Sequence, residues 1–132
     1  MTPVEIVEDF LAAVEQGRVE DASRHLDPSV RMIFPGGREY RNLTELGAVS
    51  STRYRSVGKH RDHYDTVDDV VYSWGRLYGE NLHGVRYDHV RYVDRFVLRD
   101  GLIVEQLVWN DLAETGVLNA RTADDLDPRW RP

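Results

Sequence analysis

The sequence contains no cysteine. Disulfide bonds, thiol nucleophiles and thiolate metal sites are therefore excluded together. It also has no apolar run long enough to cross a membrane, and its first residues carry neither the basic region nor the apolar core of a secretion signal. We therefore expect a cytoplasmic protein that does not interact with membranes.

Basic residues are fewer than acidic ones, 17 against 23. The formal net charge is −6, so the chain lacks the basic surface with which proteins hold phosphate backbones, and nucleic acid is not an expected partner. The 132 residues, 41% hydrophobic and 30% charged, are enough for one globular domain with its own core. We place that domain at residues 1–118 and expect a polar C-terminal tail at 119–132.

Hydrophobic periodicity predicts helices first and strands after them. Apolar residues at helical spacing follow a capping box at residues 2–5 and stop at Gly17, and further helices are expected over 19–26 and within 43–57. A period of two predicts strands at 29–34, about 61–68, 70–79, 84–99 and 102–110, with "DG" at 100–101 as a hairpin turn. This order indicates an α+β fold with the helices on one face of a mostly antiparallel sheet.

One carboxylate interrupts the apolar face of the strand predicted at 84–99. In "RYVDRFVLRDG", Tyr92, Asp94 and Phe96 share one side and the arginines take the other. Across the turn, three residues should share the face of Asp94: Gln106, Val108 and Asn110. A mostly apolar face with a few converging polar groups is typical of a small-molecule pocket. An apolar wall would raise the pKa of Asp94 and suit it to exchange protons near neutral pH.

Three stretches of the sequence resemble the NTF2-like superfamily, and within it the SnoaL-like polyketide cyclases and, more distantly, the ketosteroid isomerases. They are "FLAAVEQG", "FPGGREYRN" and "VDRFVLRDGLIVEQLVWNDL". The resemblance covers roughly residues 3–115. It implies an NTF2-like, cystatin-like cone, in which a curved mixed sheet wraps round the N-terminal helices and leaves a hydrophobic pocket at the open end. It also implies a homodimer through the outer sheet face, where Leu107 and Trp109 would point outward.

The families that this sequence resembles differ in their catalytic residues. Ketosteroid isomerases need a Tyr on the first helix and an Asp base at the first-strand corner, besides an Asp on a later strand. Those positions here are Phe10, Phe34 and Asp94, so steroid isomerisation is disfavoured. Limonene-epoxide hydrolases place an Asp where this sequence has Val108. SnoaL-like cyclases use one Asp as the acid/base of an intramolecular aldol closure, and Asp94 matches that residue.

His63 is a candidate partner for Asp94, because imidazole titrates in the useful range. A purely structural carboxylate, paired with an Arg or Tyr, is the alternative for Asp94. His60 and His63 lie three residues apart, which on a strand puts them on opposite faces, so we expect no metal site.

Other polar and aromatic residues allow two interpretations each. Tyr72 and Trp74 share one face of the strand at 70–79 and are either pocket aromatics or part of a dimer patch; we place them in the pocket. Gln106 and Asn110 either orient a substrate carbonyl or satisfy neighbouring backbone groups.

Two functions from different classes follow. The first is a SnoaL-like enzyme of the cyclase, isomerase or dehydratase type, without metal or organic cofactor, in which Asp94 and His63 exchange protons with a hydrophobic small molecule. The alternative is a dimeric protein that binds such a molecule without transforming it. In both, the following residues should line the pocket: Phe10, Phe34, Tyr72, Trp74, Tyr92, Phe96, Gln106, Val108 and Asn110.

Overall fold

A computed structural model describes all residues from Met1 to Pro132. The helices are α1 (Pro3–Glu15), α2 (Val19–Ser23), α3 (Leu43–Ser50) and α4 (Leu112–Thr115). The strands are β1 (Leu26–Phe34), β2 (Arg38–Tyr40), β3 (Tyr54–Val67), β4 (Val70–Asn81), β5 (Arg86–Arg99) and β6 (Leu102–Asn110). Three short 3-10 helices follow: η1 (Val117–Asn119), η2 (Ala123–Asp125) and η3 (Pro128–Trp130).

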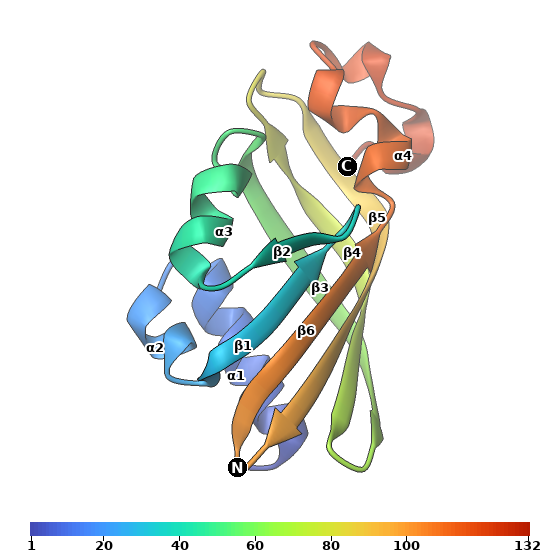
Figure 1. Ribbon diagram of the computed structural model, residues 1–132. Helices are drawn as coiled ribbons and strands as arrows, with labels where there is room; N and C mark the ends of the chain where they lie inside the picture. The colour runs from blue at the N-terminus through green and yellow to red at the C-terminus, as the bar shows by residue number, and fades with distance from the viewer.

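The six strands form one mixed sheet in the order β2-β1-β6-β5-β4-β3. Every neighbouring pair is antiparallel except β1 and β6, which run parallel. The sheet is strongly twisted, and α1, α2 and α3 lie to one side of it (Figure 1). None of the helices has both the length and the apolar character to span a bilayer. The predicted α+β architecture, with N-terminal helices on a mixed and mostly antiparallel sheet, is confirmed.

Local sequence explains why the first helix forms where it does. The Thr2 hydroxyl accepts from the backbone N–H of Glu5, whose carboxylate accepts from the backbone N–H of Thr2, and Pro3 occupies the first turn. Gly17, with φ +72°, follows the end of the helix in the left-handed conformation that favours glycine. The inward stripe of α1 is buried: Ile6, Val7, Phe10, Leu11 and Ala13.

Several element boundaries differ from the sequence prediction: the second helix ends at Ser23 and β1 begins at Leu26, and the largest difference lies between α3 and β3. The third helix ends at Ser50, and β3 begins at Tyr54 rather than near residue 61. Residues 56–59 pair with 77–80 of β4, so long-range strand pairing overrides a weak local helical pattern. The hairpin turn predicted at residues 100–101 is present, with positive φ at both Asp100 and Gly101.

Hydrophobic side chains form two clusters along the covered face of the sheet. The first joins α1, β1 and the far ends of β5 and β6, and includes Phe10, Met32 and Phe96. The second joins the opposite ends of β4 and β5 to the C-terminal segment, and includes Tyr87 and Leu126. Along β5, Asp94 lies between Phe96 of the first cluster and Tyr92 of the second.

The C-terminal segment, residues 117–130, packs against its own sheet. Val117, Ala120 and Leu126 are buried in the second cluster, and the segment stands over one end of β4 and β5 (Figure 1). The fully buried Asn81 holds this segment against the sheet. Its side-chain amide donates to the carbonyl oxygens of Val117 and Ala120 at 2.8 and 2.7 Å. The amide oxygen of Asn81 also accepts from the backbone N–H groups of residues 83 and 85. All of its principal hydrogen-bonding groups are thus used.

We expect Asn81→Ala to lower the free energy of unfolding by at least about 2 kcal/mol, because it leaves buried carbonyl and N–H groups without partners. Urea unfolding would measure the change. The matched control is Asn119→Ala, at an exposed position whose side chain makes no hydrogen bond, and it should cost less than about 0.5 kcal/mol. Equal small effects of both substitutions would mean that the segment is not held by Asn81.

Candidate functional site

Asp94 lies on the covered face of β5 and is completely buried, with 0% exposure. It stands opposite Ser73 of β4 and Val108 of β6, so it occupies the middle of the sheet. Its neighbours along the same face, Tyr92 and Phe96, are 4% and 0% exposed. The alternation of β5 therefore directs this carboxylate into the interior and the arginines of the same strand outward.

The partner of Asp94 is Lys59, on β3. The Lys59 ammonium donates to Oδ2 of Asp94 in an ion pair. It also lies 5.0 Å from the ring centre of Tyr92, close enough for a cation–π contact. The side chain of Lys59 is 20% exposed and that of Asp94 is 0% exposed. Lys59 therefore stands between the buried carboxylate and solvent.

Two buried oxygen atoms at this site have no hydrogen-bond partner: Oδ1 of Asp94 and Oε1 of Gln106. Gln106 is 3% exposed and lies on β6 opposite Phe96, which places it diagonally from Asp94 on the same face. Buried polar atoms in folded proteins are nearly always paired. These two acceptors on one face therefore lack a donor that the chain itself supplies.

Burial is the main influence on the pKa of Asp94. Desolvation raises the pKa of the Asp94 carboxyl above its ordinary value of 3.8, and the charge and hydrogen bond of Lys59 oppose that rise without cancelling it. Burial likewise raises the pKa of Tyr92 to about 12, so its hydroxyl stays protonated and hydrogen-bonds to the Ser73 hydroxyl at 3.0 Å. The site thus combines a carboxyl whose pKa is raised with a phenol that keeps its proton.

An ionic network holds α1 against β3 beside the site. Arg61, two residues along from Lys59, donates to Glu8 at 2.8 Å and to Glu15 at 2.6 Å, both on α1. The Tyr64 hydroxyl also donates to Glu8. No three His, Asp or Glu side chains converge to hold a metal ion.

Several residues predicted to line the pocket lie on the covered face. Phe10 and Phe96 meet edge to face at 6.0 Å, and Val108 is 5% exposed. Phe34 is half-buried and packs on the Tyr40 ring at 5.4 Å, within the first cluster. Asn110 is half-buried, and its side-chain oxygen accepts from the backbone N–H at position 112. Asn110 therefore satisfies the backbone, which is one of the two roles expected for it.

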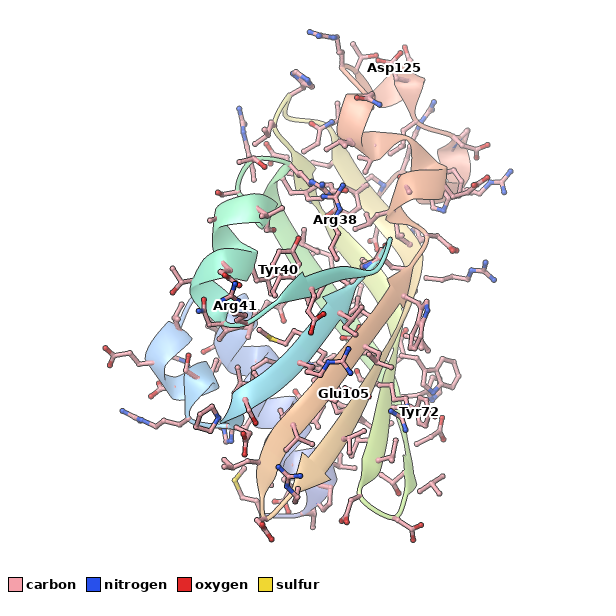
Figure 2. The ribbon with its side chains drawn as sticks, in the orientation of Figure 1. Arg38, Tyr40, Arg41, Tyr72, Glu105 and Asp125 are labelled. Atoms are coloured by element: carbon pink, nitrogen blue, oxygen red, sulfur yellow. The ribbon has the colours of Figure 1, made fainter.

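His63, Tyr72 and Trp74 are on the opposite face of the sheet from Asp94. Ser73 stands opposite Asp94, so its neighbours Tyr72 and Trp74 must point the other way. The His63 ring stacks on Trp74 at 4.3 Å, and Figure 2 shows Tyr72 on the side of the sheet away from the helices. Placing these three residues with Asp94 is therefore wrong. The sequence did not fix the face of β4, and the register against β5 decides it.

Two surface hollows lie elsewhere on the molecule. One, near the C-terminal segment, is lined by His89, Arg91, Asp111, Glu114, Arg129 and Trp130. The other lies over β3, β4 and the start of β5 and includes His60 and Tyr78. Asp94 lines neither hollow.

Sequence reasoning missed Lys59, although a signal for it was present. Lys59 is the only lysine among the 17 basic side chains of the Lys and Arg types. Its separation from Asp94 by 35 residues hides the contact from any local pattern.

We expect Lys59→Met to raise the pKa of Asp94 further, by at least about one pH unit, because Lys59 supplies the charge that lowers it. Carbon-13 NMR of the carboxyl group would measure this pKa. The stability that protonated Asp94 contributes is present below pH 3.8 and is lost as pH rises through the raised folded-state pKa. The variant should therefore lose stability over a higher pH window than the parent.

The control is Arg95→Met. It removes a cation from the outer face of β5, the strand that carries Asp94, where Arg95 pairs with Glu105. It should leave the pKa of Asp94 unchanged. A similar pKa in the parent and in Lys59→Met would show that Lys59 does not act on this carboxyl.

Comparison with known proteins agrees with this architecture. The model of the SnoaL-like domain family matches residues 7–106. TerC, co-crystallised with polyporic acid, has 18% identity and a TM-score of 0.82 over 90% of this chain and 100% of its own. An NTF2-like protein of unknown function from Burkholderia pseudomallei K96243 has 17% identity and a TM-score of 0.81 over 91% and 100%.

A protein assigned as a SnoaL-like polyketide cyclase, from Jannaschia sp. CCS1, has 20% identity and a TM-score of 0.75 over 89% of this chain and 92% of its own. No curated protein matches the sequence. At these identities the similar structures establish the fold, and the domain model, which spans most of the chain, establishes the family. This chain belongs to the SnoaL-like family of NTF2-like proteins.

Proposed function

We propose that this protein is a SnoaL-like small-molecule enzyme of the cyclase, isomerase or dehydratase type, with Asp94 as its acid/base. The observation that carries the proposal is the state of one carboxyl group: Asp94 is fully buried, Oδ2 is paired with Lys59, and Oδ1 has no partner. A buried carboxyl whose pKa is raised and whose second oxygen is free is a candidate for proton transfer.

In this proposal Oδ1 of Asp94 removes a proton from the carbon next to a substrate carbonyl and returns it at another atom. Negative charge then develops on the substrate oxygen, and the Lys59 ammonium is the cation available to stabilise it. The aromatic rings of Tyr92 and Phe96 keep the surroundings dry, which strengthens both effects. The substrate enters from the side of Lys59, where the site meets solvent.

Two of the similar structures support a small organic molecule as the substrate. One, TerC, was crystallised with polyporic acid, and another is assigned as a polyketide cyclase. Both point to small organic molecules as the partners of this fold. We carry that class, and nothing narrower, to this chain.

The second candidate is a binding protein that holds a hydrophobic molecule unchanged. It is favoured by Phe10 and Phe34, which stand where ketosteroid isomerases have catalytic groups, and by an ion pair that neutralises Asp94. Mass spectrometry of material released from the purified protein would distinguish the two. A ligand that is recovered and stays intact on long incubation favours binding alone.

We also propose that the outer face of the sheet forms a homodimer. Trp74, Val93 and Trp109 stand side by side across β4, β5 and β6 on that face. The two tryptophans are 39% and 53% exposed, and aromatic area of this size is enriched in protein interfaces. The arginines and glutamates around this row would form a polar rim, as in the Arg95–Glu105 pair at 3.1 Å.

Replacing Asp94 by Asn should lower the rate of proton exchange by about 10²- to 10⁴-fold, the usual contribution of a general acid or base. The assay follows loss of α-carbon protons from a panel of hydroxyaryl ketones and β-keto esters in heavy water by NMR. It needs no knowledge of the final product. The matched control is Asp100→Asn, an exposed turn residue, which should retain the parent rate. Undiminished exchange in Asp94→Asn would remove the proposal.

Replacing Trp109 by Asp should weaken dimerisation by roughly 30-fold, the effect of losing an interface side chain that contributes about 2 kcal/mol. Sedimentation equilibrium would measure the association constant. Leu82→Asp serves as the control, because Leu82 is 43% exposed but lies in the turn after β4 rather than on the sheet face. A parent protein that sediments as a monomer at all concentrations would contradict the dimer.

A further inference from the structure

The chemical identity of the Asp94 partner is unusual for this chain. Of its 17 lysine and arginine residues, one is a lysine, and that lysine contacts the one fully buried carboxylate. Every other ion pair of the protein is made by an arginine or a histidine. The chemistry required at position 59 therefore differs from that of an ordinary ion pair.

The neighbouring residue on the same side of β3 shows the contrast. Arg61 holds Glu8 and Glu15 and so fixes α1 to the sheet. A guanidinium suits this structural role, since it stays charged and its planar donors can hold two acceptors. An amine makes a poorer clamp but can give up its proton and become a nucleophile. The chain thus has arginine where α1 is fixed to β3, and lysine beside the buried carboxylate.

The surroundings of Lys59 provide what an amine nucleophile requires. The side chain of Lys59 is 20% exposed whereas that of Asp94 is fully buried, so Lys59 is the member of the pair that an incoming molecule can reach first. An acid/base is in direct contact with the amine. The free oxygens of Asp94 and Gln106 offer acceptors for a hydroxyl group or a departing water.

We propose that Lys59 is an amine nucleophile that forms an imine with a ketone or aldehyde substrate, and that Asp94 moves the protons of this reaction. The proposal deepens the proposed function, on which it rests for the role of Asp94, and it names the substrate class as carbonyl compounds with a hydrogen on the α-carbon.

The reaction balances with the groups at the site. A proton passes from Nζ of Lys59 to Oδ2 of Asp94, with which Nζ is in direct contact, and leaves a neutral amine and a carboxylic acid. The amine attacks the carbonyl carbon, and the carbonyl oxygen takes the proton from Asp94. The nitrogen of the protonated carbinolamine gives a proton to the Asp94 carboxylate, which passes it to the hydroxyl group. Water then leaves, and an iminium–carboxylate pair remains. The C=O double bond of the substrate is replaced by a C=N double bond to Nζ, and one water is released.

The iminium acidifies the α-carbon more strongly than the parent carbonyl does. Asp94, ionised again, lies beside it and removes the α-proton to give an enamine. From this intermediate the same site can form a new carbon–carbon bond, move a double bond or expel a β-hydroxyl group. Imine formation therefore accounts for cyclase, isomerase and dehydratase chemistry with one pair of residues.

Acetylacetone tests the amine directly, because a nucleophilic lysine converts this diketone to a stable vinylogous amide that absorbs in the near ultraviolet. We expect the folded full-length protein to gain the mass of the diketone less one water, and peptide mapping to place it on Lys59 rather than on the N-terminal amine. The folded protein should react at least about 100-fold faster than the same chain unfolded in guanidinium, given the contribution of a positioned acid/base.

Three variants complete the experiment, each checked for folding by circular dichroism. Lys59→Arg should form no adduct on the β3 peptide, Asp94→Asn should form it about 100-fold more slowly, and Asp100→Asn should behave as the parent. An adduct that forms no faster in the folded parent than in the unfolded chain overturns the proposal, as does an undiminished rate in Asp94→Asn.

Proton exchange in heavy water separates this inference from the proposed function. If Lys59→Arg keeps the exchange activity that Asp94→Asn loses, Asp94 is the acid/base and Lys59 is not a nucleophile. If Asp94→Asn keeps its activity, the proposed function itself fails. Loss of both adduct and exchange in Lys59→Arg, with a folded protein, supports imine formation.

Discussion

The pair of Lys59 and Asp94 is the constraint on which the rest of the interior depends. Burying a carboxylate completely is costly unless it is paired, and Lys59 is the cation that pairs with Asp94. The pair links β3 to β5 across β4, and the two hydrophobic clusters pack on either side of it. It is costly as a structural device, because well-packed apolar side chains stabilise a core as well or better. That cost is the physical reason to connect it with function.

Polar contacts from two different parts of the chain close the interior. On one side, Arg61 fixes α1 to β3 through Glu8 and Glu15. At the other end, Asn81 holds the C-terminal segment over β4 and β5 (Figure 1). Each is a polar contact made at the edge of a hydrophobic cluster, so each fixes geometry more than it adds buried area. Together they leave Lys59 as the part of the site that faces solvent.

The two faces of the sheet serve different purposes, and the strand alternation divides the residues between them. The covered face holds Asp94, Ser73 and Gln106, each below 4% exposure. The outer face holds the row of Trp74, Val93 and Trp109. Because the side-chain period of a strand is two, one residue of register would exchange these sets. The register between β4 and β5 is therefore what separates the site from the surface proposed for dimerisation.

The sequence by itself determined the class of fold, the helix and hairpin boundaries near strong local signals, and the inward direction of Asp94. These follow from periodicity and capping, which act over a few residues: Thr2 and Glu5 start the first helix, and Asp100 and Gly101 turn the last hairpin. Tertiary structure alone decided that Lys59 and not His63 meets Asp94, that Tyr72 and Trp74 face outward, and that residues 117–130 pack on the sheet. The physical reason is the same in each case. These contacts join residues distant in sequence, and strand register, which no local pattern encodes, brings them together.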